Sequence, residues 1–367
     1  MGLPTNSTTC PVCAAKLVKN GQTAAGTQRW LCSSCRASSV RKRPDVTRRE
    51  QTRRFALWIT GKRTQAELDG TATGRTFRRE TAWCWRLQPC LPRATKTDHA
   101  VLVDGIWIGT WCLLIAINDT GHVLAWQWCA RETTAAWEAL LNQIPAPAVI
   151  VSDGGSGLPT ALHHCWPETK HQRCIFHLQM NVTRHLTRTP RTDAGRALRK
   201  LVMQLSTVTD EDEAIAWQLH LEQWWQTFGH LTRERTLLRN GRWSFTHDRL
   251  RTAWLLIRKV TRDGVLFTWI SYGNPRTTSP LEGGINSRIR DLLRHHRGMS
   301  ETHRRRAVEW FLTLHETDLD TAINTTTNEP EKRQPNPAPE PDGPALYDTG
   351  LTPEEGLYPR KGWAGRT

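Results

Sequence analysis

Two closely spaced cysteine pairs near the N-terminus constrain the fold of this chain more than any other feature. Cys10 and Cys13 form the first pair, Cys32 and Cys35 form the second, and eighteen residues separate the two pairs. This spacing is typical of a zinc ion held by four thiolates, whereas a redox role or chance pairing is the alternative. So short a segment cannot bury a core, and zinc supplies the missing folding energy. We therefore predict a zinc ribbon over residues 1–45 with a structural Zn²⁺ ion.

The charge of the chain is strongly basic and unevenly distributed. The sequence holds 50 Lys and Arg residues against 35 Asp and Glu, and residues 1–100 alone carry +13 of the net +15. Such surfaces bind polyanions because phosphate contacts release counterions. A second cluster comprises Arg288, Arg290, Arg294, Arg297, Arg304, Arg305 and Arg306. A bias toward arginine codons would spread the charge evenly, so the two blocks favour a polyanion as the partner.

The chain divides into four blocks. Residues 1–45 hold the cysteine pairs, 46–95 have a helical pattern, and 98–315 alternate apolar strands with helices. The last block, 321–367, contains 8 of the 20 prolines and is predicted to be a disordered tail. No stretch approaches the roughly 18 apolar residues that span a bilayer, and no secretory signal is evident. We expect a cytoplasmic, nucleoid-associated protein with no membrane partner.

The second block has the pattern of a helix-turn-helix. A first helix is predicted around residues 65–68, with Gly70 and Gly74 at the turn. In the second helix, Phe77, Cys84 and Leu87 have the spacing of a buried face. With that face buried, four arginines face outward, and we predict that they bind DNA: Arg75, Arg78, Arg79 and Arg86. An ordinary structural pair of basic helices is the alternative.

The third block alternates strands and helices. Strand-like runs at 99–109, 111–118 and 122–129 include a hairpin around Asp119-Thr120-Gly121. A helix at 133–144, a buried strand at 147–153, a helix at 157–165 and a short strand within 173–181 follow. Residues of about 178–270 read as helical. This order predicts an α/β sheet with a helical insertion.

Two acids are predicted on neighbouring strands of this sheet. Asp104 lies inside an apolar strand, where an ionised side chain is costly without compensation. Asp153 ends a second apolar strand before Gly154 and Gly155. Either acid alone is as easily a turn or cap residue. Together, on adjacent strands, the two carboxylates would share divalent cations.

A third acid follows the helical insertion. Leu281, Ile285, Ile289 and Leu292 form an apolar stripe at helical spacing. A step of about 100° per residue places Glu282 at the edge of that stripe and Asp291 in solvent. Asn286 and Arg290 lie near the same flank as Glu282 and are predicted to support the site or contact a phosphate.

These motifs together resemble the mutator-type transposases of bacterial insertion sequences. The resemblance rests on Asp104 in its strand, "VSDGGSGL" around Asp153, Cys174-x2-His177, and "TSPLEGGINSRIR" around Glu282, and it covers about residues 46–315. It implies a ribonuclease H-like catalytic core over 98–315 with a helical insertion, and a catalytic triad of Asp104, Asp153 and Glu282. The zinc ribbon departs from the plainest members of that family.

The resemblance also implies chemistry and partners. The triad would bind Mg²⁺, or Mn²⁺, and two metal ions would assist cleavage at the element ends and strand transfer into target DNA. The DNA partners would be terminal repeats and target duplex, and synapsis of two ends favours a homodimer or larger assembly. Cys174 and His177 would be auxiliary, because one Cys and one His make an incomplete zinc site.

Two other functions remain open from the sequence. A ribonuclease H-like nuclease with the same core would cleave DNA or RNA without joining it. A transcription regulator would use the zinc ribbon and the helix-turn-helix, and would not need its carboxylates to converge. The positions of the three carboxylates distinguish the regulator from the two enzymes.

Overall fold

The computed structural model describes residues 9–326, apart from residues 11, 25, 27, 40–43 and 71. The chain forms two compact units. The first combines the residues up to Pro92 with the segment from Ile289 onward, and the second comprises Arg93–Arg288. The predicted catalytic block, 98–315, therefore ends in helices that the structure groups with the first unit.

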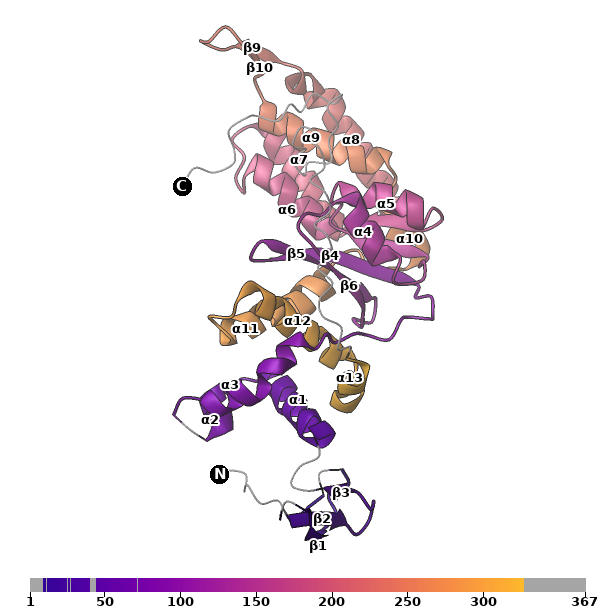
Figure 1. The fold of residues 1–367 in the computed structure, drawn as a ribbon. Coiled ribbons are helices and arrows are strands. Elements are labelled where there is room, and N and C mark those ends of the chain that lie inside the picture. The colour runs from indigo at the N-terminus through magenta and orange to yellow at the C-terminus, as the bar shows by residue number, and fades with distance from the viewer. Residues whose placement is uncertain are drawn as a thin grey trace. The chain divides into compact units, whose positions relative to one another are not determined.

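A small antiparallel sheet carries the N-terminal cysteines (Figure 1). Its strands β1 (Leu17–Gln22), β2 (Gln28–Cys32) and β3 (Ser38–Ser39) pair in the order β1-β2-β3. The Cys10–Cys13 turn precedes β1, and the Cys32–Cys35 turn joins β2 to β3. The strands bury few side chains, as expected for a ribbon stabilised by a metal rather than by a core.

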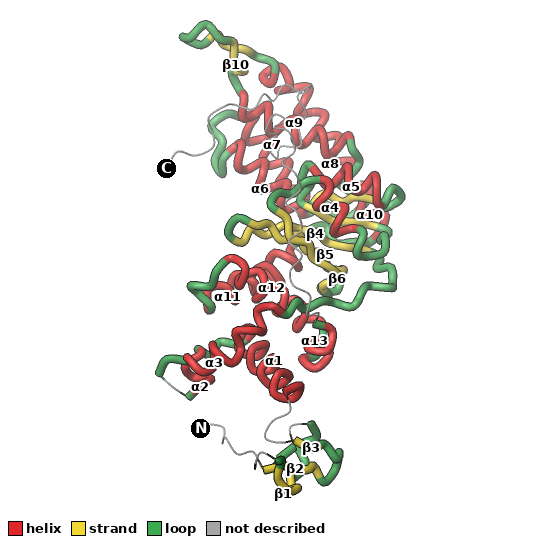
Figure 2. Tube along the Cα trace, in the orientation of Figure 1, coloured by secondary structure: helices red, strands yellow, loops and turns green. Residues whose placement is uncertain are grey.

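Helices make up the rest of the first unit (Figure 2). They are α1 (Pro44–Thr60), α2 (Gln65–Asp69), α3 (Arg75–Thr81), the 3-10 helix η1 (Ala82–Arg86), most of α11 (Ser287–His295), α12 (Glu301–Glu316) and α13 (Leu319–Thr325). Phe55 on α1 packs edge-on against Trp310 on α12, with ring centroids 6.1 Å apart. Both side chains are fully buried, so residues from the two ends of the described chain share one core.

The second unit is built on a five-stranded mixed sheet in the order β6-β5-β4-β7-β8. Its strands are β4 (Ala100–Ile108), β5 (Trp111–Asn118), β6 (Val123–Cys129), β7 (Val149–Ser152) and β8 (Lys170–Arg173). The first three are antiparallel, and β7 and β8 run parallel to β4. The predicted α/β class, the hairpin and the succession of strands and helices along the chain up to β8 are confirmed.

The two faces of the sheet have different coverings. Val101 and Val103 of β4 pack with helices α4 (Thr134–Leu141) and α5 (Gly157–Cys165) in one apolar cluster. Since neighbouring strand residues point to opposite faces, Asp104 projects from the other face of the sheet. The segment that covers β4 there includes η4, a π-helix at Pro280–Asn286 that contacts this strand.

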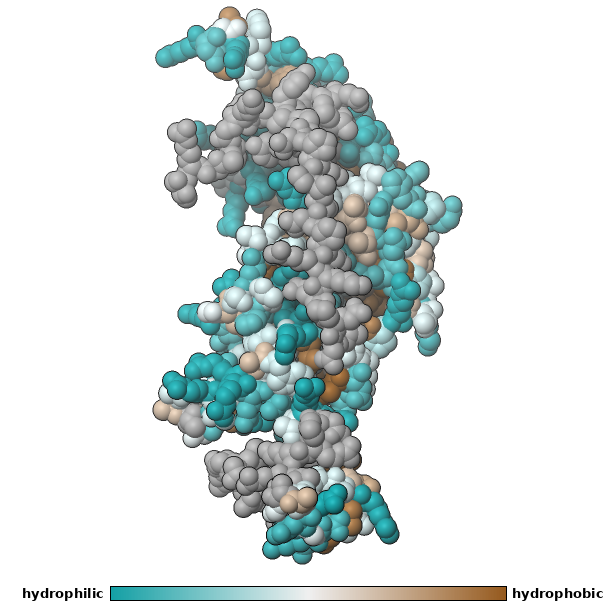
Figure 3. All heavy atoms as spheres, viewed as in Figure 1, coloured by the Kyte–Doolittle hydropathy of each residue, from teal (hydrophilic) through white to brown (hydrophobic). Residues whose placement is uncertain are grey.

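A helical subdomain follows β8. It contains α6 (Ile175–Leu186), α7 (Asp193–Met203), η2 (Gln204–Ser206), α8 (Glu211–Phe228), η3 (Gly229–Thr232), α9 (Asp248–Arg262) and α10 (Thr268–Tyr272). Trp217 and Trp224 are buried in its core, and each donates its indole N–H to a helix carbonyl. On the face shown in Figure 3, hydrophilic residues predominate over the described part of this subdomain.

Three predicted elements differ from the structure. The strand expected within 173–181 is β8, which ends at Arg173, and the apolar run after it forms α6. The insertion is not wholly helical, because β9 (Arg235–Leu237) and β10 (Trp243–Phe245) form a hairpin around a turn with Gly241 at φ +75°. Helix α13 continues past the predicted start of the tail, and residues 327–367 lie outside the described residues.

No helix in the described part of the chain is both long enough and apolar enough to cross a membrane.

Candidate functional site

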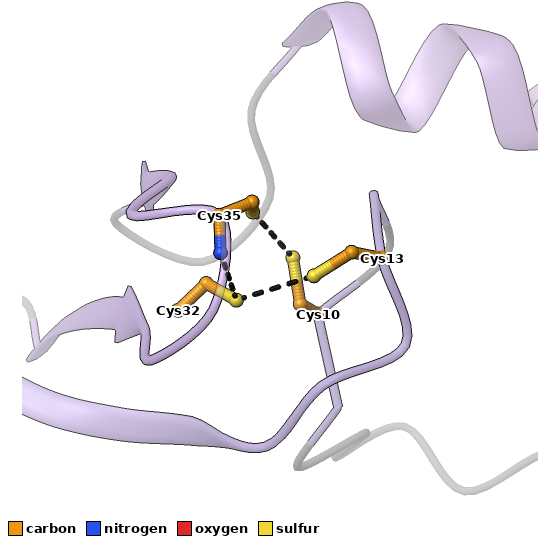
Figure 4. Close-up of side chains that lie close together, drawn as sticks. All are labelled: Cys10, Cys13, Cys32 and Cys35. Atoms are coloured by element: carbon orange, nitrogen blue, oxygen red, sulfur yellow. Dashed lines mark hydrogen bonds between the residues drawn. The ribbon is translucent and has the colours of Figure 1, made fainter.

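The four N-terminal cysteines converge on one point (Figure 4). The Cys10 and Cys35 sulfurs are 3.6 Å apart, and the Cys13 and Cys32 sulfurs are 3.4 Å apart. All four lie within 4.8 Å of one another. Sulfurs bound to one tetrahedral zinc at ~2.3 Å would be about 3.8 Å apart, so the cluster fits this ion.

Backbone groups prepare these sulfurs for a cation. The N–H of Val12 points at the Cys10 sulfur and the N–H of Cys35 at the Cys32 sulfur, each at 3.4 Å. Hydrogen bonds to its sulfur, that of the Cys35 N–H foremost, outweigh burial and lower the pKa of Cys32 to about 6. At Cys35 the backbone hydrogen bond from Ala37 is outweighed by hydrogen bonds with the other three thiols and by burial, which raise the pKa of Cys35 to about 12. Thiolates are the form that binds zinc. The predicted ligand set is therefore assembled as a structural zinc ribbon requires.

The predicted helix pair is present and presents its arginines to solvent. The side chain of Thr64 accepts from the Glu67 N–H and Glu67 accepts from the Thr64 N–H, which begins α2 with a capping box. Gly70 and Gly74 both have positive φ, and a β-carbon on Gly74 would lie 2.8 Å from Gln65. Phe77, Cys84 and Leu87 are buried as predicted. The four predicted DNA-binding residues, Arg75, Arg78, Arg79 and Arg86, are all exposed.

The second arginine cluster is only partly available to a ligand. Arg288, Arg290, Arg294 and Arg297 are exposed on and beyond α11 (Ser287–His295). Arg306 is buried and pairs with the buried Glu309, so including it in a polyanion-binding cluster was wrong. A buried pair of opposite charges contributes to the packing of α12 instead. Arg290 lies in the first unit.

Asp104 is a buried acid on the central strand. Asp104 is 8% exposed, and it pairs with Ile115 across the β4–β5 ladder. The Asn286 side-chain N–H donates to Asp104 Oδ2 at 2.8 Å, which joins residues 182 positions apart in the chain. Asn286 is itself buried, and its Oδ1 has no hydrogen-bond partner among the described residues. An oxygen acceptor thus lies unused beside a buried carboxylate.

The pKa of Asp104 is raised to about 7, and burial is the largest cause, because the ionised form loses hydration. The negative charge of Asp153 is the next cause, and the charge of Glu282 acts in the same direction. His177 acts in the opposite direction. The charges of Asp153 and Glu282 thus both act on Asp104, and a cation would lower the cost of ionising it. Among the described residues, however, the three carboxylates do not form a group within 4.8 Å of one another.

Asp153 follows β7 in a tight glycine turn. Asp153 Oδ1 accepts the N–H of Gly155 at 3.0 Å, and Gly154 has φ +82°. A β-carbon on Gly154 would overlap Arg173 Nη1, so only glycine fits beneath this buried guanidinium. The turn therefore places a positive group beside the Asp153 loop.

Glu282 is half-buried in the first turn of η4. Its Oε1 accepts the Thr278 hydroxyl at 2.8 Å and lies 3.6 Å from His177 Nδ1. The predicted apolar stripe is buried and Asp291 is exposed, as expected. The helix there is a π-helix, however, so the assumed step of 100° per residue does not hold through Pro280–Asn286. Such irregular turns are frequent at functional sites.

Cys174 and His177 lie next to Glu282. One ligand atom from each of these three residues lies within 4.8 Å of the others. Burial opposes ionisation of the Cys174 thiol, but hydrogen bonds from His177 and Thr278 outweigh it and lower the pKa of Cys174. Burial also disfavours the His177 cation; the Cys174 interactions and the charges of Glu282 and Asp153 outweigh it and raise the pKa of His177 to about 9.

The sequence prediction missed three polar residues around these acids: Glu132, Arg173 and Thr278. Glu132 Oε2 and Asp153 Oδ1 lie 3.6 and 3.7 Å from the point that a β-carbon on Gly155 would occupy. Glu132 precedes the N-cap Thr133 of α4, which gives it no distinctive sequence signal. Thr278 is buried in the segment before η4, where only its position four residues before Glu282 could have indicated a contact.

The fold and these residues define an α/β protein with a buried acid, Asp104, on the central strand of its sheet and a four-cysteine ribbon before it. Residues 110–246 match the model of the Mutator family of transposases, and residues 4–36 match the InsA N-terminal domain, a zinc ribbon. The predicted resemblance is confirmed over these segments. The Mutator-family match includes Asp153, Cys174 and His177, but it does not extend to Asp104 or Glu282.

Two curated relatives are similar to part of the chain. The transposase for insertion sequence element IS6120 of Mycolicibacterium smegmatis is 33% identical over 123 residues, which cover 29% of this chain and 38% of that protein. The transposase for IS905 of Lactococcus lactis subsp. lactis is 28% identical over 116 residues, covering 27% of this chain and 30% of that protein. The similarity thus spans well under half of either relative.

Proposed function

We propose that this chain is an insertion-sequence transposase that cleaves DNA at the element ends and joins them to target DNA. The observation that carries the proposal is the buried Asp104 carboxylate on the central strand, which accepts a hydrogen bond from the distant Asn286. Burial and the charges of Asp153 and Glu282 raise its pKa, as expected for an acid that a cation would compensate. The Mutator-family match over residues 110–246 supports the proposal. A transcription regulator would gain nothing from this costly arrangement of charge.

The proposed catalytic metal ions are Mg²⁺ or Mn²⁺, bound by the carboxylates of Asp104, Asp153 and Glu282. Both are hard cations that prefer oxygen ligands. The three carboxylates would offer such oxygens, and the unpartnered Oδ1 of buried Asn286 adds another acceptor for a metal-bound water. When bound, the ions would activate water and then a 3′-hydroxyl, and would stabilise the charge that develops on the phosphate oxygens.

The residues of the chain prepare this chemistry. Asn286 orients Asp104 through its 2.8 Å hydrogen bond, and Gly155 fixes the Asp153 carboxylate. Cys174 and His177 act as auxiliary groups beside Glu282. A ribonuclease H-like core is proposed for this unit, and the mixed sheet with Asp104 on its central strand supports it. We place Arg290 among the phosphate contacts, on account of its exposed position on α11.

DNA binding is assigned to the first unit. The zinc ribbon and the exposed arginines of α3 and η1 would contact the phosphates of the terminal repeats. Because transposition joins two element ends in one complex, the active form is proposed to be a dimer or a larger assembly. The affinity for DNA and the cleavage and joining of DNA would therefore depend on different parts of the chain.

An Asp153→Asn variant tests this division. It should abolish cleavage and strand transfer of matched element ends with Mg²⁺, while DNA affinity stays equal or rises slightly, because a negative charge near phosphates is lost. Asp119→Asn is the matched control, since Asp119 is an exposed acid in the β5–β6 turn of the same unit. The assay uses the full chain with DNA from the sequences that flank its coding region.

The two rival functions predict other outcomes. A nuclease would cleave the ends but leave pre-cut 3′-hydroxyl ends unjoined in the presence of target DNA. A regulator would neither nick nor join DNA, and Asp153→Asn would leave its activity unchanged. Either pattern with correctly matched ends would refute the transposase proposal.

A further inference from the structure

Thr278 is a fully buried residue whose hydroxyl lies among three functional side chains. Its Oγ1 is 2.8 Å from Glu282 Oε1, 3.4 Å from Cys174 Sγ and 3.5 Å from His177 Nδ1. A threonine hydroxyl has one hydrogen to donate. A carboxylate only accepts, and a short bond to an ionised acceptor is the strongest of the three. The hydroxyl hydrogen therefore goes to Glu282.

The backbone of Thr278 acts on the same residue. Its carbonyl accepts the N–H of Leu281 at 2.9 Å and the N–H of Glu282 at 3.1 Å. Leu281 is fully buried, which fixes the rotation of this first turn of η4. One residue thus holds Glu282 through both its side chain and its main chain.

Cys174 links Thr278 to the strand that precedes Asp153. The Cys174 N–H donates to the carbonyl of Ser152 at 2.7 Å, and the Thr278 N–H donates to the Cys174 sulfur at 3.4 Å. A continuous path of hydrogen bonds therefore runs from the end of β7, through Cys174 and Thr278, to the Glu282 carboxylate. The residues along this path are buried up to Glu282 itself, whose side chain is 26% exposed.

We propose that Thr278 is a positioning residue, which with Cys174 holds the Glu282 carboxylate at a fixed place relative to Asp153. The inference rests on the proposed function, because it assigns these two acids to one metal site. It also gives the Cys-x2-His motif a specific role, in which Cys174 anchors Thr278 and Thr278 orients the ligand. Without the hydroxyl, Glu282 keeps its place in the chain but loses the bond that selects one side-chain orientation.

The predicted effect is a loss of metal affinity rather than a loss of folding. Removing a group that orients a metal ligand costs about 10–100-fold in metal affinity. Thr278→Val keeps the shape of the side chain and removes the hydroxyl, whereas Thr278→Ser keeps the hydroxyl. We expect Mn²⁺ binding by the valine variant to weaken by about 10–100-fold, and the serine variant to bind nearly as wild type does.

The experiment measures free Mn²⁺ by electron paramagnetic resonance in titrations of the full-length, zinc-loaded chain. The Mg²⁺ concentration for half-maximal cleavage and the unfolding temperature are recorded for the same samples. Thr232→Val is the matched control, because Thr232 is 2% exposed in the same unit and its hydroxyl donates only to the Gly229 carbonyl. This control should leave Mn²⁺ affinity unchanged.

Two results would overturn the inference. One is a folded Thr278→Val variant that binds Mn²⁺ as tightly as wild type. The other is a Thr278→Ser variant that binds as weakly as the valine variant, a result that excludes the hydroxyl as the cause even where valine also lowers the unfolding temperature. Failure of the proposed function has a separate signature, because wild type would then bind Mn²⁺ but leave element ends uncut or unjoined.

Discussion

Replacing Asp104 with asparagine should make the metal-free protein more stable at alkaline pH. The substitution keeps an oxygen that accepts the Asn286 hydrogen bond, and it removes a charge that is buried beside other acids. Burial first, and the charge of Asp153 second, raise the pKa of Asp104 from 3.8 to about 7 in the folded protein. The folded state therefore binds this proton more tightly than the unfolded state does.

The size and sign of the effect follow from this shift. A shift of about three pKa units at ~1.36 kcal/mol each corresponds to at most about 4 kcal/mol. An acid with a raised folded pKa costs no stability below pH 3.8, and its cost grows as pH rises toward 7 and is constant above that. Asp104→Asn should therefore match wild type near pH 4 and exceed it at pH 8.

Thermal unfolding at several pH values checks this prediction, with divalent cations removed by a chelator that leaves the zinc site loaded. For a unit of this size, ~4 kcal/mol corresponds to a rise in Tm on the order of 8–16 °C. Asp119→Asn provides the exposed control. Added Mg²⁺ should stabilise wild type and not the Asp104→Asn variant. A gain that is equal at pH 4 and pH 8, or no gain at pH 8, would refute the electrostatic reasoning.

Three further changes test other parts of the molecule. Cys13→Ser should prevent stoichiometric zinc binding and unfold the ribbon. Elemental analysis and circular dichroism of the full chain would detect both effects, and unchanged zinc content would contradict the ligand set. Arg78→Ala with Arg79→Ala should weaken DNA binding and flatten its log–log salt dependence by about 0.9 per lost phosphate contact, and an unaltered slope would remove these residues from the interface. Gly154→Ala should lower stability by more than the ~1–3 kcal/mol of a left-handed residue, since its β-carbon would collide with Arg173, and a neutral result in unfolding measurements would show that this side chain relocates freely.

Local patterns predicted the second unit well. The apolar strands and the Asp119-Thr120-Gly121 turn are encoded by neighbouring residues, so the hairpin of β5 and β6 and the helix α5 followed from periodicity. The prediction placed strand β8 too late in the chain, within residues 173–181, because the sequence of the actual strand, Lys-His-Gln-Arg, has no apolar residue. Its Gln172 is buried through hydrogen bonds to distant backbone groups, which no local pattern reveals.

The sequence nominated residues for the candidate site but not the contacts among them. Asp104, Asp153 and Glu282 were selected from apolar surroundings and from the family resemblance. The bond from Asn286 to Asp104 agrees with the predicted flank of the helix, although the π-helical turn was not expected. Thr278 could not be selected, because its importance depends on tertiary contacts with Cys174 and His177 that form only in the folded chain.

The same limit applies to the first unit. The helical pattern of residues 46–95 was evident, and the burial of Phe77 confirmed its inward face. Nothing in that pattern showed that α1 requires α12 as a packing partner. The contact between Phe55 and Trp310 joins segments more than two hundred residues apart, and such pairing is decided by complementary shape rather than by periodicity.

The route of the chain has an evolutionary and practical consequence. It leaves the first unit after Pro92 and returns to it at Ile289, so the unit with the carboxylates is an insertion within the unit with the exposed arginines. Recombination at a single crossover would graft α1 from one parent onto α12 from another, with Phe55 and Trp310 drawn from different genes. Chimaeras made to exchange the first unit, the proposed DNA-binding part, must therefore replace two separated segments together, whereas the inserted unit is exchangeable as one cassette between two junctions.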